Sequence, residues 1–588
     1  MPSPPRRSAL LVALAMAAGL GSSQAQTTST DPHTAILRAD NARITTPEQR
    51  ATIDAALASD APDIRVRALR AIGRTRRAEF LPLAIAALTA LSLDVRREAA
   101  FAVASIGSGE PAALAPASRA LADALKRETD ILVCAALAEE YGRLPFDAAD
   151  IPSAARALQS LAARLAVDGR PPALVGLGIA RGAEALARRS ARVKADAPDL
   201  VALLASMYTP ADVRGAGEDL LRARIRRLAV SGLVALDAVS TAQGDLALAD
   251  PDAQVRRLGV MAVSRRQPAT GNRQPDSRRA AGAPDGSNRL RRTSQPVGRL
   301  LDDPAVIVRH AVVSRFGAAL PEIATAALGD SHVNIRLAAI DALGDAHACT
   351  DACTTRLNGV GVFEDSRQPA TGKRQPDTRH GDEWHERAHA LVALAKTDAA
   401  RARQFIARAA DDATWQVRMY AARAAGIAKQ ADVITRLADD AHVNVRHAAL
   451  VAWREAGLPG ATEAAIAALS SDDGQLVLEA ATMLSATGGT KVVTAVRAAL
   501  ARITAQDRET SRDPRVALVD AIAAIDPDRD ATLRPYLADA DPFVVDRVAT
   551  LLGARPPQRP PHEMRVSVPT AADVDALDRT TVTLRLRG

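Results

Sequence analysis

A short phrase recurs along this sequence of 588 residues and constrains its fold more than any other feature. The phrase is an aliphatic residue followed by Arg, with an Asp five residues upstream in its clearest copies. Val308-Arg309 and Ile335-Arg336 are 27 residues apart, and Val417-Arg418 and Val445-Arg446 are 28 residues apart. Looser copies occur at Ile64-Arg65, Val95-Arg96 and Val255-Arg256. Recurrence at this spacing predicts a protein built from stacked repeats.

Within each copy, the apolar residues follow the period of an α-helix. Ile335, Ala339, Ala342 and Leu343 are spaced at i, i+4, i+7 and i+8, so they share one helix face. A helical hairpin of this kind cannot bury its apolar stripe alone, and stacking on its neighbours provides the missing contacts. The composition agrees, because 48% hydrophobic but only 2% aromatic residues favour thin layers of Ala, Leu, Val and Ile. We therefore predict an all-α fold in which helical hairpins form one elongated stack.

These residues resemble the HEAT-repeat family, including its short bacterial form, in which an Asp, an aliphatic-Arg pair and a terminal Ala-x-x-Ala-Leu-Gly mark the second helix. The terminal part is clearest at Ala339 to Gly344 and at Ala68 to Gly73. The resemblance covers most of residues 36–554 and implies a right-handed α-solenoid. In the family, the Asp and Arg side chains tie adjacent units together. The resemblance thus implies a structural rather than a ligand-binding role for a ladder formed by Arg65, Arg96, Arg309, Arg336, Arg418 and Arg446.

The N-terminus has the pattern of a secretory signal peptide. Arg6 and Arg7 precede an apolar run from Ala9 to Leu20, and Ser23-Gln24-Ala25 offers the small residues that a signal peptidase accepts. We predict a signal peptide at 1–25, a flexible N-terminus at 26–35 and an exported, periplasmic protein. No later stretch has the 18 or more apolar residues expected of a transmembrane helix.

Two polar inserts interrupt the repeats and are near copies of each other. Residues 266–278 recur almost unchanged at 367–379, and Pro and Gly break both copies every few residues. Such segments cannot form a packed hairpin, so we predict disordered inserts at 264–299 and 364–381. Either a mobile DNA element translated in frame or a selected binding motif explains the repetition. The first insert alone carries a charge equal to the formal +7 of the whole sequence, so the basic balance does not predict nucleic-acid binding.

Three cysteines are present. Cys134 lies within an apolar helical stretch and is interpreted as a small core residue. Cys349 and Cys353 are four residues apart, and an oxidising compartment permits them to form a disulfide. Two free thiols, or a metal site that includes the nearby His347, are the alternatives.

One motif matches a metalloprotease pattern. In His385-Glu386-Arg387-Ala388-His389, two His one turn apart could bind zinc with Glu386 as base. A third ligand is not evident, and the apolar spacing around the motif is that of another solenoid helix. We therefore favour an ordinary helix, predict no cofactor, and keep His385, Glu386 and His389 as weak metal candidates.

The C-terminus changes character. Residues 555–561 form a Pro-rich linker, and 562–588 alternate as in β-strands but are too few for an independent domain. The arrangement is similar to exported bacterial proteins in which a HEAT array precedes a cyclophilin-type peptidyl-prolyl isomerase domain, and Thr581 to Gly588 resembles the opening strand of that domain. Because the cyclophilin's catalytic residues have no counterpart in this sequence, the resemblance implies a truncated domain rather than isomerase activity.

Two functional hypotheses follow. The first is a non-catalytic scaffold that binds a protein or peptide on the concave face lined by the second helix of each repeat. Candidate contact residues on these helices are Arg423, His447 and Arg454. The second is an enzyme-related protein, either a truncated HEAT/cyclophilin isomerase or a metal-dependent HEAT-like enzyme. The sequence favours the scaffold and leaves the identity of the partner and the oligomeric state open.

Overall fold

The structure is a computed structural model that describes residues 31–208, 220–265, 297–358, 383–506 and 509–554. The predicted signal peptide at 1–25, the linker at 555–561, the tail at 562–588, the insert at 364–381 and nearly all of the insert at 264–299 lie outside the described residues. The described residues are helices joined by short connections, with one isolated bridge between Val167 and Arg170. The predicted all-α fold of stacked helical hairpins is confirmed. The chain divides into two compact units, up to Leu258 and from Gly259.

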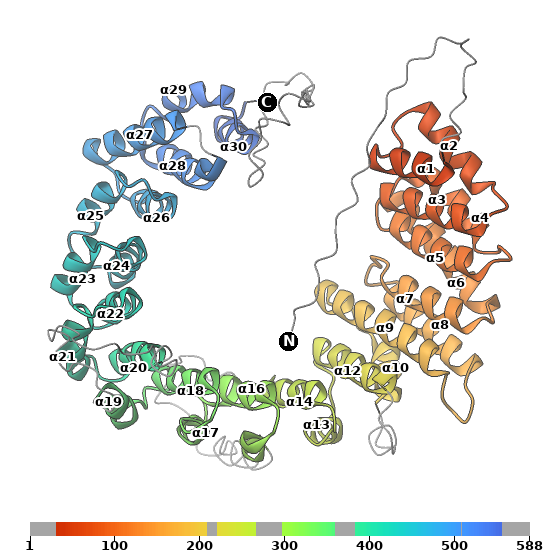
Figure 1. Ribbon diagram of the computed structural model, residues 1–588, viewed down its shortest axis with the longest axis horizontal. Helices are drawn as coiled ribbons and strands as arrows, with labels where there is room; N and C mark the ends of the chain where they lie inside the picture. Colours follow the sequence, from red (N-terminus) through yellow and green to blue (C-terminus); the bar gives the residue numbers. More distant parts are fainter. Residues whose placement is uncertain (1–30, 209–219, 266–296, 359–382, 507–508, 555–588) are drawn as a thin grey trace, which may run out of the picture. The chain divides into compact units, whose positions relative to one another are not determined.

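In the first unit, the helices stack in two rows (Figure 1). One row contains α3, α5, α7, α9 and α12, and the other contains α4, α6, α8 and α10, with each helix packed on the next in its row. Helix α1 begins at Pro32, before the predicted solenoid start at residue 36, because the Asp31 side chain accepts bonds from the first free N–H groups. The helices are α1 (Pro32–Asn41), α2 (Pro47–Leu57), α3 (Pro62–Thr75), α4 (Leu81–Ala87), α5 (Leu93–Gly107), α6 (Pro111–Arg127), α7 (Ile131–Gly142), α8 (Ile151–Arg164), α9 (Ala173–Val193), α10 (Pro198–Ser206), α12 (Leu220–Ala235), α13 (Thr241–Leu248) and α14 (Ala253–Arg265), within which the division falls.

The second unit repeats this arrangement. Its even-numbered helices pack in succession and lie on the inner side of the unit's arc, and its odd-numbered helices lie on the outer side (Figure 1). We call the even-numbered helices the inner row. They are α16 (Val306–Phe316), α18 (Val333–Asp345), α20 (Glu383–Thr397), α22 (Trp415–Ile427), α24 (Val443–Ala456), α26 (Gly474–Leu484), α28 (Arg512–Ile525) and α30 (Pro542–Leu552). The outer row is α17 (Pro321–Ala327), α19 (Thr350–Asn358), α21 (Ala399–Ala409), α23 (Ala431–Ala438), α25 (Ala461–Ala468), α27 (Thr490–Ala505) and α29 (Arg529–Leu533).

The recurring Asp and Arg join neighbouring repeats by hydrogen bonds at the helix starts. Arg418 Nη1 donates to the carbonyl oxygen of Asp412 in its own repeat at 2.8 Å, while its Nε and Nη2 donate to the Asp440 carboxylate of the next repeat at 2.7 and 2.9 Å. Asp440 Oδ1 in turn accepts from the backbone N–H of His442 at 2.8 Å, which shapes the turn before α24. Arg309 makes the equivalent bonds to Asp303 and Asp330. One phrase of sequence thus both starts a helix and ties it to its neighbour.

The ladder predicted from the sequence is not uniform. Arg96 pairs with Glu128 at 2.8 Å, and Arg336 pairs with Glu386 at 2.6 Å, so a Glu replaces the Asp at these two steps. Arg446 bonds the carbonyl oxygens of its own turn. The Arg65 side chain makes no hydrogen bond or ion pair with any other residue that the structure describes. The contacts of Arg96, Arg309, Arg336 and Arg418 support the structural role.

Removing a ladder carboxylate should destabilise the second unit in a pH-dependent way. The hydrogen bonds from Arg418 lower the pKa of Asp440, as those from Arg309 lower the pKa of Asp330. A carboxyl group with a lowered folded-state pKa stabilises the fold above its unfolded pKa, near 4, and the contribution is lost as the pH falls through the folded-state value. We expect Asp440→Ala to reduce the free energy of unfolding by about 1.5–3 kcal/mol at pH 7.

Urea unfolding followed by circular dichroism at several pH values measures this effect. As the pH falls below about 4, the deficit of the variant should shrink, because the carboxylate becomes protonated first in the unfolded state and then, at its lowered pKa, in the folded state of the unaltered protein. Asp432→Asn is the matched control, since Asp432 is exposed on the outer-row helix α23 and lies outside the ladder. An Asp440→Ala deficit of the same size at pH 3 and pH 7 would show that the ion pair does not cause it.

Small residues allow the helices of a row to approach closely. A Cβ atom added to Gly344 would lie 2.8 Å from Ala393, and one added to Gly426 would lie 2.9 Å from Ala452. In the first unit, Gly73 meets Ala102 in the same way. These contacts fix which residues of successive helices face each other. They also explain why the sequence repeats Gly at the end of its helical phrase.

Candidate functional site on the inner helix row

Successive helices of a row are also joined by polar side chains, which lie on the solvent-exposed side of the contact between Gly of one helix and Ala of the next. In the first unit, Arg70 of α3 pairs with Glu98 of α5 at 2.8 Å. In the second unit, Asp341 of α18 contacts His389 of α20 at 2.7 Å. In both pairs, the first residue precedes the close-approach glycine by three positions, and the second precedes the facing alanine by four. In these two steps, the repeat places a polar contact between neighbouring helices at the same pair of positions.

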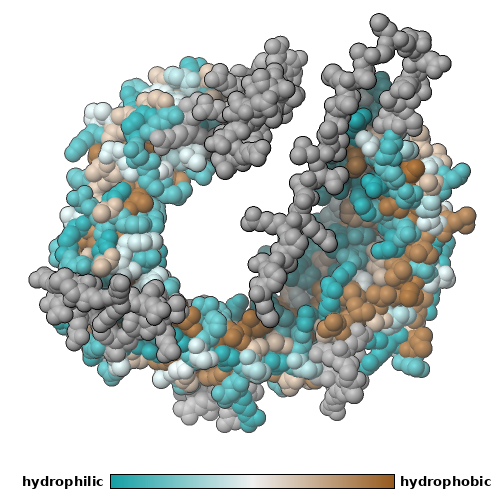
Figure 2. All heavy atoms as spheres, viewed as in Figure 1, coloured by the Kyte–Doolittle hydropathy of each residue, from teal (hydrophilic) through white to brown (hydrophobic). Residues whose placement is uncertain are grey.

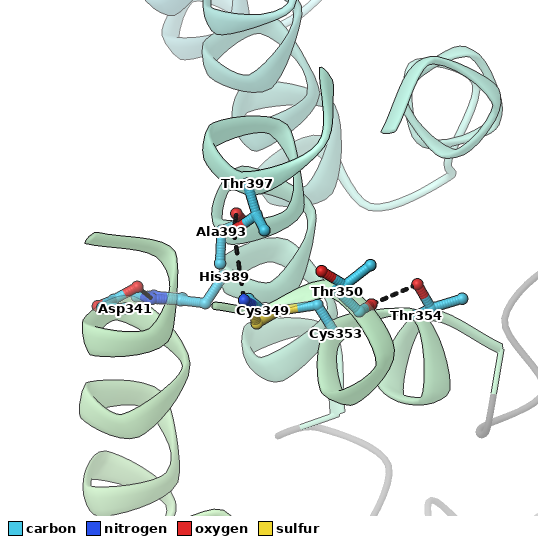
Figure 3. Close-up of a disulfide and its surroundings, with 8 residues drawn as sticks. All are labelled: Asp341, Cys349, Thr350, Cys353, Thr354, His389, Ala393 and Thr397. Atoms are coloured by element: carbon cyan, nitrogen blue, oxygen red, sulfur yellow. Dashed lines mark hydrogen bonds and ion pairs between the residues drawn. A yellow bond between two sulfur atoms is a disulfide. The ribbon is translucent and has the colours of Figure 1, made fainter. Parts of the chain in front are cut away.

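At the centre of the second unit, this contact extends over three helices. His389 Nδ1 lies 2.7 Å from Asp341 Oδ1, and His389 Nε2 lies 3.1 Å from the Tyr420 hydroxyl oxygen on α22. The Arg423 guanidinium lies over the Tyr420 ring, 4.8 Å from its centroid. Figure 3 shows Asp341 and His389 pointing toward each other between α18 and α20. We call Asp341, His389, Tyr420 and Arg423 the inner polar cluster.

The geometry sets the direction of the hydrogen bonds in the inner polar cluster. An ionised carboxylate only accepts, so Asp341 accepts a hydrogen bond from His389 Nδ1–H. When the imidazole is neutral, its Nε2 is an acceptor and receives the Tyr420 O–H. The Asp341 carboxylate thus orients the imidazole, and the imidazole orients the phenol. The result is a fixed polar and aromatic surface on the exposed side of α18, α20 and α22.

The surroundings of the inner polar cluster are mixed. Figure 2 shows polar residues interspersed with apolar ones along the inner edge of the second unit. Val392 follows His389 by three residues and Met419 precedes Tyr420, and both are half-buried. Lys396, one turn further along α20, pairs with Asp345 at 2.6 Å. A surface of this kind can take both apolar and charged side chains of a partner.

The three metal candidates, His385, Glu386 and His389, contact different partners. His385 stacks on Trp384 with ring centroids 3.6 Å apart. Glu386 pairs with Arg336 at 2.6 Å and with Arg356 at 3.3 Å, and His389 belongs to the inner polar cluster. In the described parts of the chain, no group of three or more His, Cys, Asp or Glu side chains is arranged to hold a metal ion. The contacts of His385, Glu386 and His389 favour a helix surface over a zinc site.

The three partner-binding candidates lie on the inner row, but only Arg423 joins the inner polar cluster. Arg454 of α24 is exposed, and its Nε lies 3.1 Å from Glu479 Oε1 on α26. His447 is half-buried on α24. Asp341 and Tyr420 were not among the sequence candidates. Their positions in the repeat, six residues after Ile335 and three after Val417, are the signal that could have indicated them.

A disulfide lies beside this site. Cys349 and Cys353 are joined at the start of α19 with their Cα atoms 5.3 Å apart, and both are buried. The Cys349 backbone N–H donates to Thr397 Oγ1 at the end of α20, at 3.3 Å (Figure 3). His347 Nδ1 lies 2.7 Å from the Lys396 carbonyl oxygen. This contact engages the histidine side chain that the alternative metal site would have used. The hydrogen bond from Cys349 to Thr397 joins the start of α19 to the helix that carries His389.

The remaining cysteine is buried in the first unit. Cys134 is a free thiol, and burial raises its pKa. None of the described helices has an apolar stretch of the length and hydropathy needed to cross a bilayer.

Comparison with known proteins gives a likeness of fold only. No protein-family model matches the sequence, and no curated protein sequence matches it. The YibA protein of Escherichia coli shares 15% identity over 47% of this chain and 99% of its own, with a TM-score of 0.29. The karyopherin Kap121p, bound to the extreme C-terminus of the protein phosphatase Cdc14p, shares 11% identity over 86% of this chain and 62% of its own, with a TM-score of 0.45. The Kap95:Nup1 complex shares 13% identity over 87% of this chain and 78% of its own, with a TM-score of 0.46. At these values the likeness assigns no ligand or partner to this chain.

Proposed function

We propose that this protein is an exported, non-catalytic scaffold that binds an extended segment of a partner protein on the inner row of its second unit. The observation that carries the proposal is the inner polar cluster, which places a carboxylate, an imidazole, a phenol and a guanidinium across three successive helices. Their side chains are held by contacts with one another. A segment lying across the helices would meet all of them.

The construction of the row favours binding by a preformed surface. The ladder bonds and the glycine contacts fix each helix against the next, so little side-chain or backbone freedom is lost when a partner binds. Tyr and Arg are the residue types that most often dominate binding energy at protein interfaces. Half-buried apolar side chains such as Val392 and Val451 lie among the polar groups and can contact apolar side chains of the segment.

Export is part of the proposal. It is supported by the basic, apolar and small-residue pattern of residues 1–25 and by the Cys349–Cys353 disulfide, since disulfides persist in oxidising compartments. Fractionation of cells that express the full-length gene should find the mature chain, beginning at Gln26, outside the cytoplasm. An uncleaved cytoplasmic chain would overturn this part of the proposal.

Peptide selection combined with site-specific cross-linking tests the binding surface. Peptides are selected on the purified protein from a display library, and each is then cross-linked to variants with a photoreactive residue at Val392 or at Thr435. Val392 lies one helical turn from His389 on the inner row, and Thr435 is exposed on the outer-row helix α23. Peptides should cross-link from position 392 and not from 435. Tyr420→Ala should weaken binding by about tenfold or more. Equal cross-linking from both positions, with no effect of Tyr420→Ala, would contradict the proposal.

A further inference from the structure

Arg423 stands at a position that has a cross-helix partner in two other helix steps. It precedes the close-approach Gly426 by three residues, as Arg70 precedes Gly73 and Asp341 precedes Gly344. On the next helix, the facing position is four residues before the contacting alanine, and it carries Glu98 and His389 in those two steps. In the step from α22 to α24, that position is Ala448, because the contacting alanine is Ala452. The repeat therefore leaves Arg423 without its cross-helix acceptor.

The contacts of Arg423 agree with the absence of an acceptor at position 448. Its side chain is exposed, and it makes no hydrogen bond or ion pair with any residue in the described ranges. The Tyr420 ring nevertheless holds the guanidinium in place, 4.8 Å from the ring centroid. Arg454, the next exposed Arg of the inner row, differs because it pairs with Glu479 at 3.1 Å. Arg423 thus presents an oriented guanidinium whose donors match the two oxygens of a carboxylate.

The state of His389 decides what the neighbouring Tyr420 hydroxyl can do. With a neutral imidazole, the hydroxyl donates its proton to His389 Nε2 and offers only lone pairs to a ligand. With a protonated imidazole, both ring nitrogens donate, so His389 Nε2–H bonds the Tyr420 oxygen and the phenolic proton becomes available to another acceptor. Protonation also adds one positive charge beside the carboxylate of Asp341. Both changes favour an anionic ligand next to Arg423.

Several charged groups of α20 and of the helices packed against it pair with one another. From α18, Asp341 faces His389, and Asp345 pairs with Lys396. From α22, Tyr420 and Arg423 are the groups on this side. Helices α19 and α21 belong to the outer row. Arg356 of α19 pairs with Glu386 of α20, and Arg401 of α21 pairs with Asp351 of α19. His389 is the one histidine of the inner polar cluster, and histidine is the residue type that changes charge between roughly pH 5 and 8.

We propose that Arg423 and Tyr420 bind a carboxylate of an acidic peptide segment, and that protonation of His389 strengthens this binding. The inference rests on the proposed function, since it names the chemistry of the segment that the inner row holds. Charge complementarity supports it: the exposed Arg423 guanidinium has no carboxylate partner in the described ranges, and the facing position, which carries Glu98 in the step from α3 to α5, is occupied by Ala448. Arg423 Nη and Nε donate to the two carboxylate oxygens, and the Tyr420 O–H donates a third bond at acidic pH.

Peptide binding to the purified full chain at constant ionic strength tests the inference. The probe is a labelled peptide of alternating Glu and Ala residues, compared with its Gln counterpart and with a phosphoserine counterpart, at pH 6 and pH 8. The Glu peptide should bind about fivefold more tightly at pH 6 than at pH 8, and the Gln peptide should bind weakly at both. Arg423→Met should weaken binding of the Glu peptide by about tenfold or more.

Two further variants separate the roles of the residues. His389→Gln should abolish the difference between pH 6 and pH 8 while binding at pH 8 persists. Arg403→Met, the matched control for an exposed Arg on the outer-row helix α21, should change the affinity by less than about twofold. Circular dichroism of each variant verifies that it is folded.

Several outcomes would overturn the inference. They are equal binding of the Glu and Gln peptides, binding of the phosphoserine peptide alone, an Arg423→Met affinity equal to that of the unaltered protein, or a pH dependence that survives His389→Gln. If library peptides still cross-link from position 392, the carboxylate assignment fails while the scaffold function stands. If no peptide cross-links there, the scaffold proposal itself fails.

Discussion

Replacing Asp250 by Ala is expected to destabilise the first unit by about 3–5 kcal/mol. Asp250 accepts hydrogen bonds from Arg226 Nε and Nη2 at 3.0 and 3.1 Å, and the Tyr208 hydroxyl lies 3.4 Å away. The Arg226 and Asp250 side chains are only 3% and 0% exposed, so this is the ladder contact in its most buried form. Burial and the Asp250 carboxylate also raise the pKa of Tyr208, which keeps its hydroxyl protonated. Removal of Asp250 leaves the Arg226 charge buried without this carboxylate.

Guanidinium unfolding followed by circular dichroism measures the loss. Tryptophan fluorescence provides an internal comparison, because the three Trp residues, Trp384, Trp415 and Trp453, all belong to the second unit. In a stack stabilised by nearest neighbours, the fluorescence transition should shift less than the dichroism transition. A double variant, Arg226→Met with Asp250→Leu, removes both charges and should recover most of the lost stability. A loss below about 1 kcal/mol for Asp250→Ala would show that the pair does not hold this repeat.

A second large effect is expected at the contact between α7 and α9. A Cβ atom added to Gly178 would lie 2.2 Å from the Ala135 carbonyl oxygen and 2.6 Å from its Cα atom. Because both are backbone atoms, no side-chain rotation can make room, and the two helices must move apart. We expect Gly178→Val to cost about 3 kcal/mol or more, at the upper end of the range for overpacked cores.

The same unfolding experiment gives the result for Gly178→Val. Gly329→Ala is the matched control, because a Cβ at Gly329 would meet no atom within 4 Å, and its stability should stay within about 0.5 kcal/mol of the unaltered protein. An unchanged midpoint for Gly178→Val would mean that α7 and α9 do not pack as closely as the structure places them.

The repeated elements could be predicted from the sequence because the same physical requirement acts at each repeat. Ile335, Val417 and Val445 start apolar faces that each bury against the next helix, and all three are buried. The ladder Asp residues follow because a helix start needs acceptors for its free N–H groups, and the ladder Arg residues follow because they donate to these carboxylates and so tie neighbouring repeats together. A signal repeated many times stands out even when a single copy is weak.

The inner polar cluster could not be predicted in the same way. Asp341 and His389 are 48 residues apart, because residues 359–382 separate α19 from α20, and their contact depends on which residues of α18 and α20 meet at Gly344. The Arg423 position appears in the sequence as one more exposed Arg. Its lack of a partner depends on Ala448, a residue that carries no signal of its own. Conversely, the His-Glu-x-x-His string has the spacing of a metal motif, whereas in the structure His385, Glu386 and His389 have different partners.

Hydrogen–deuterium exchange of the full chain, alone and saturated with a peptide selected on it, tests the central claim most directly. If the inner row of the second unit is the partner surface, bound peptide should slow exchange in α20 and α22, and exchange in the outer-row helices α21 and α23 should stay unchanged. Slower exchange confined to the outer row, or to the first unit, would contradict the claim.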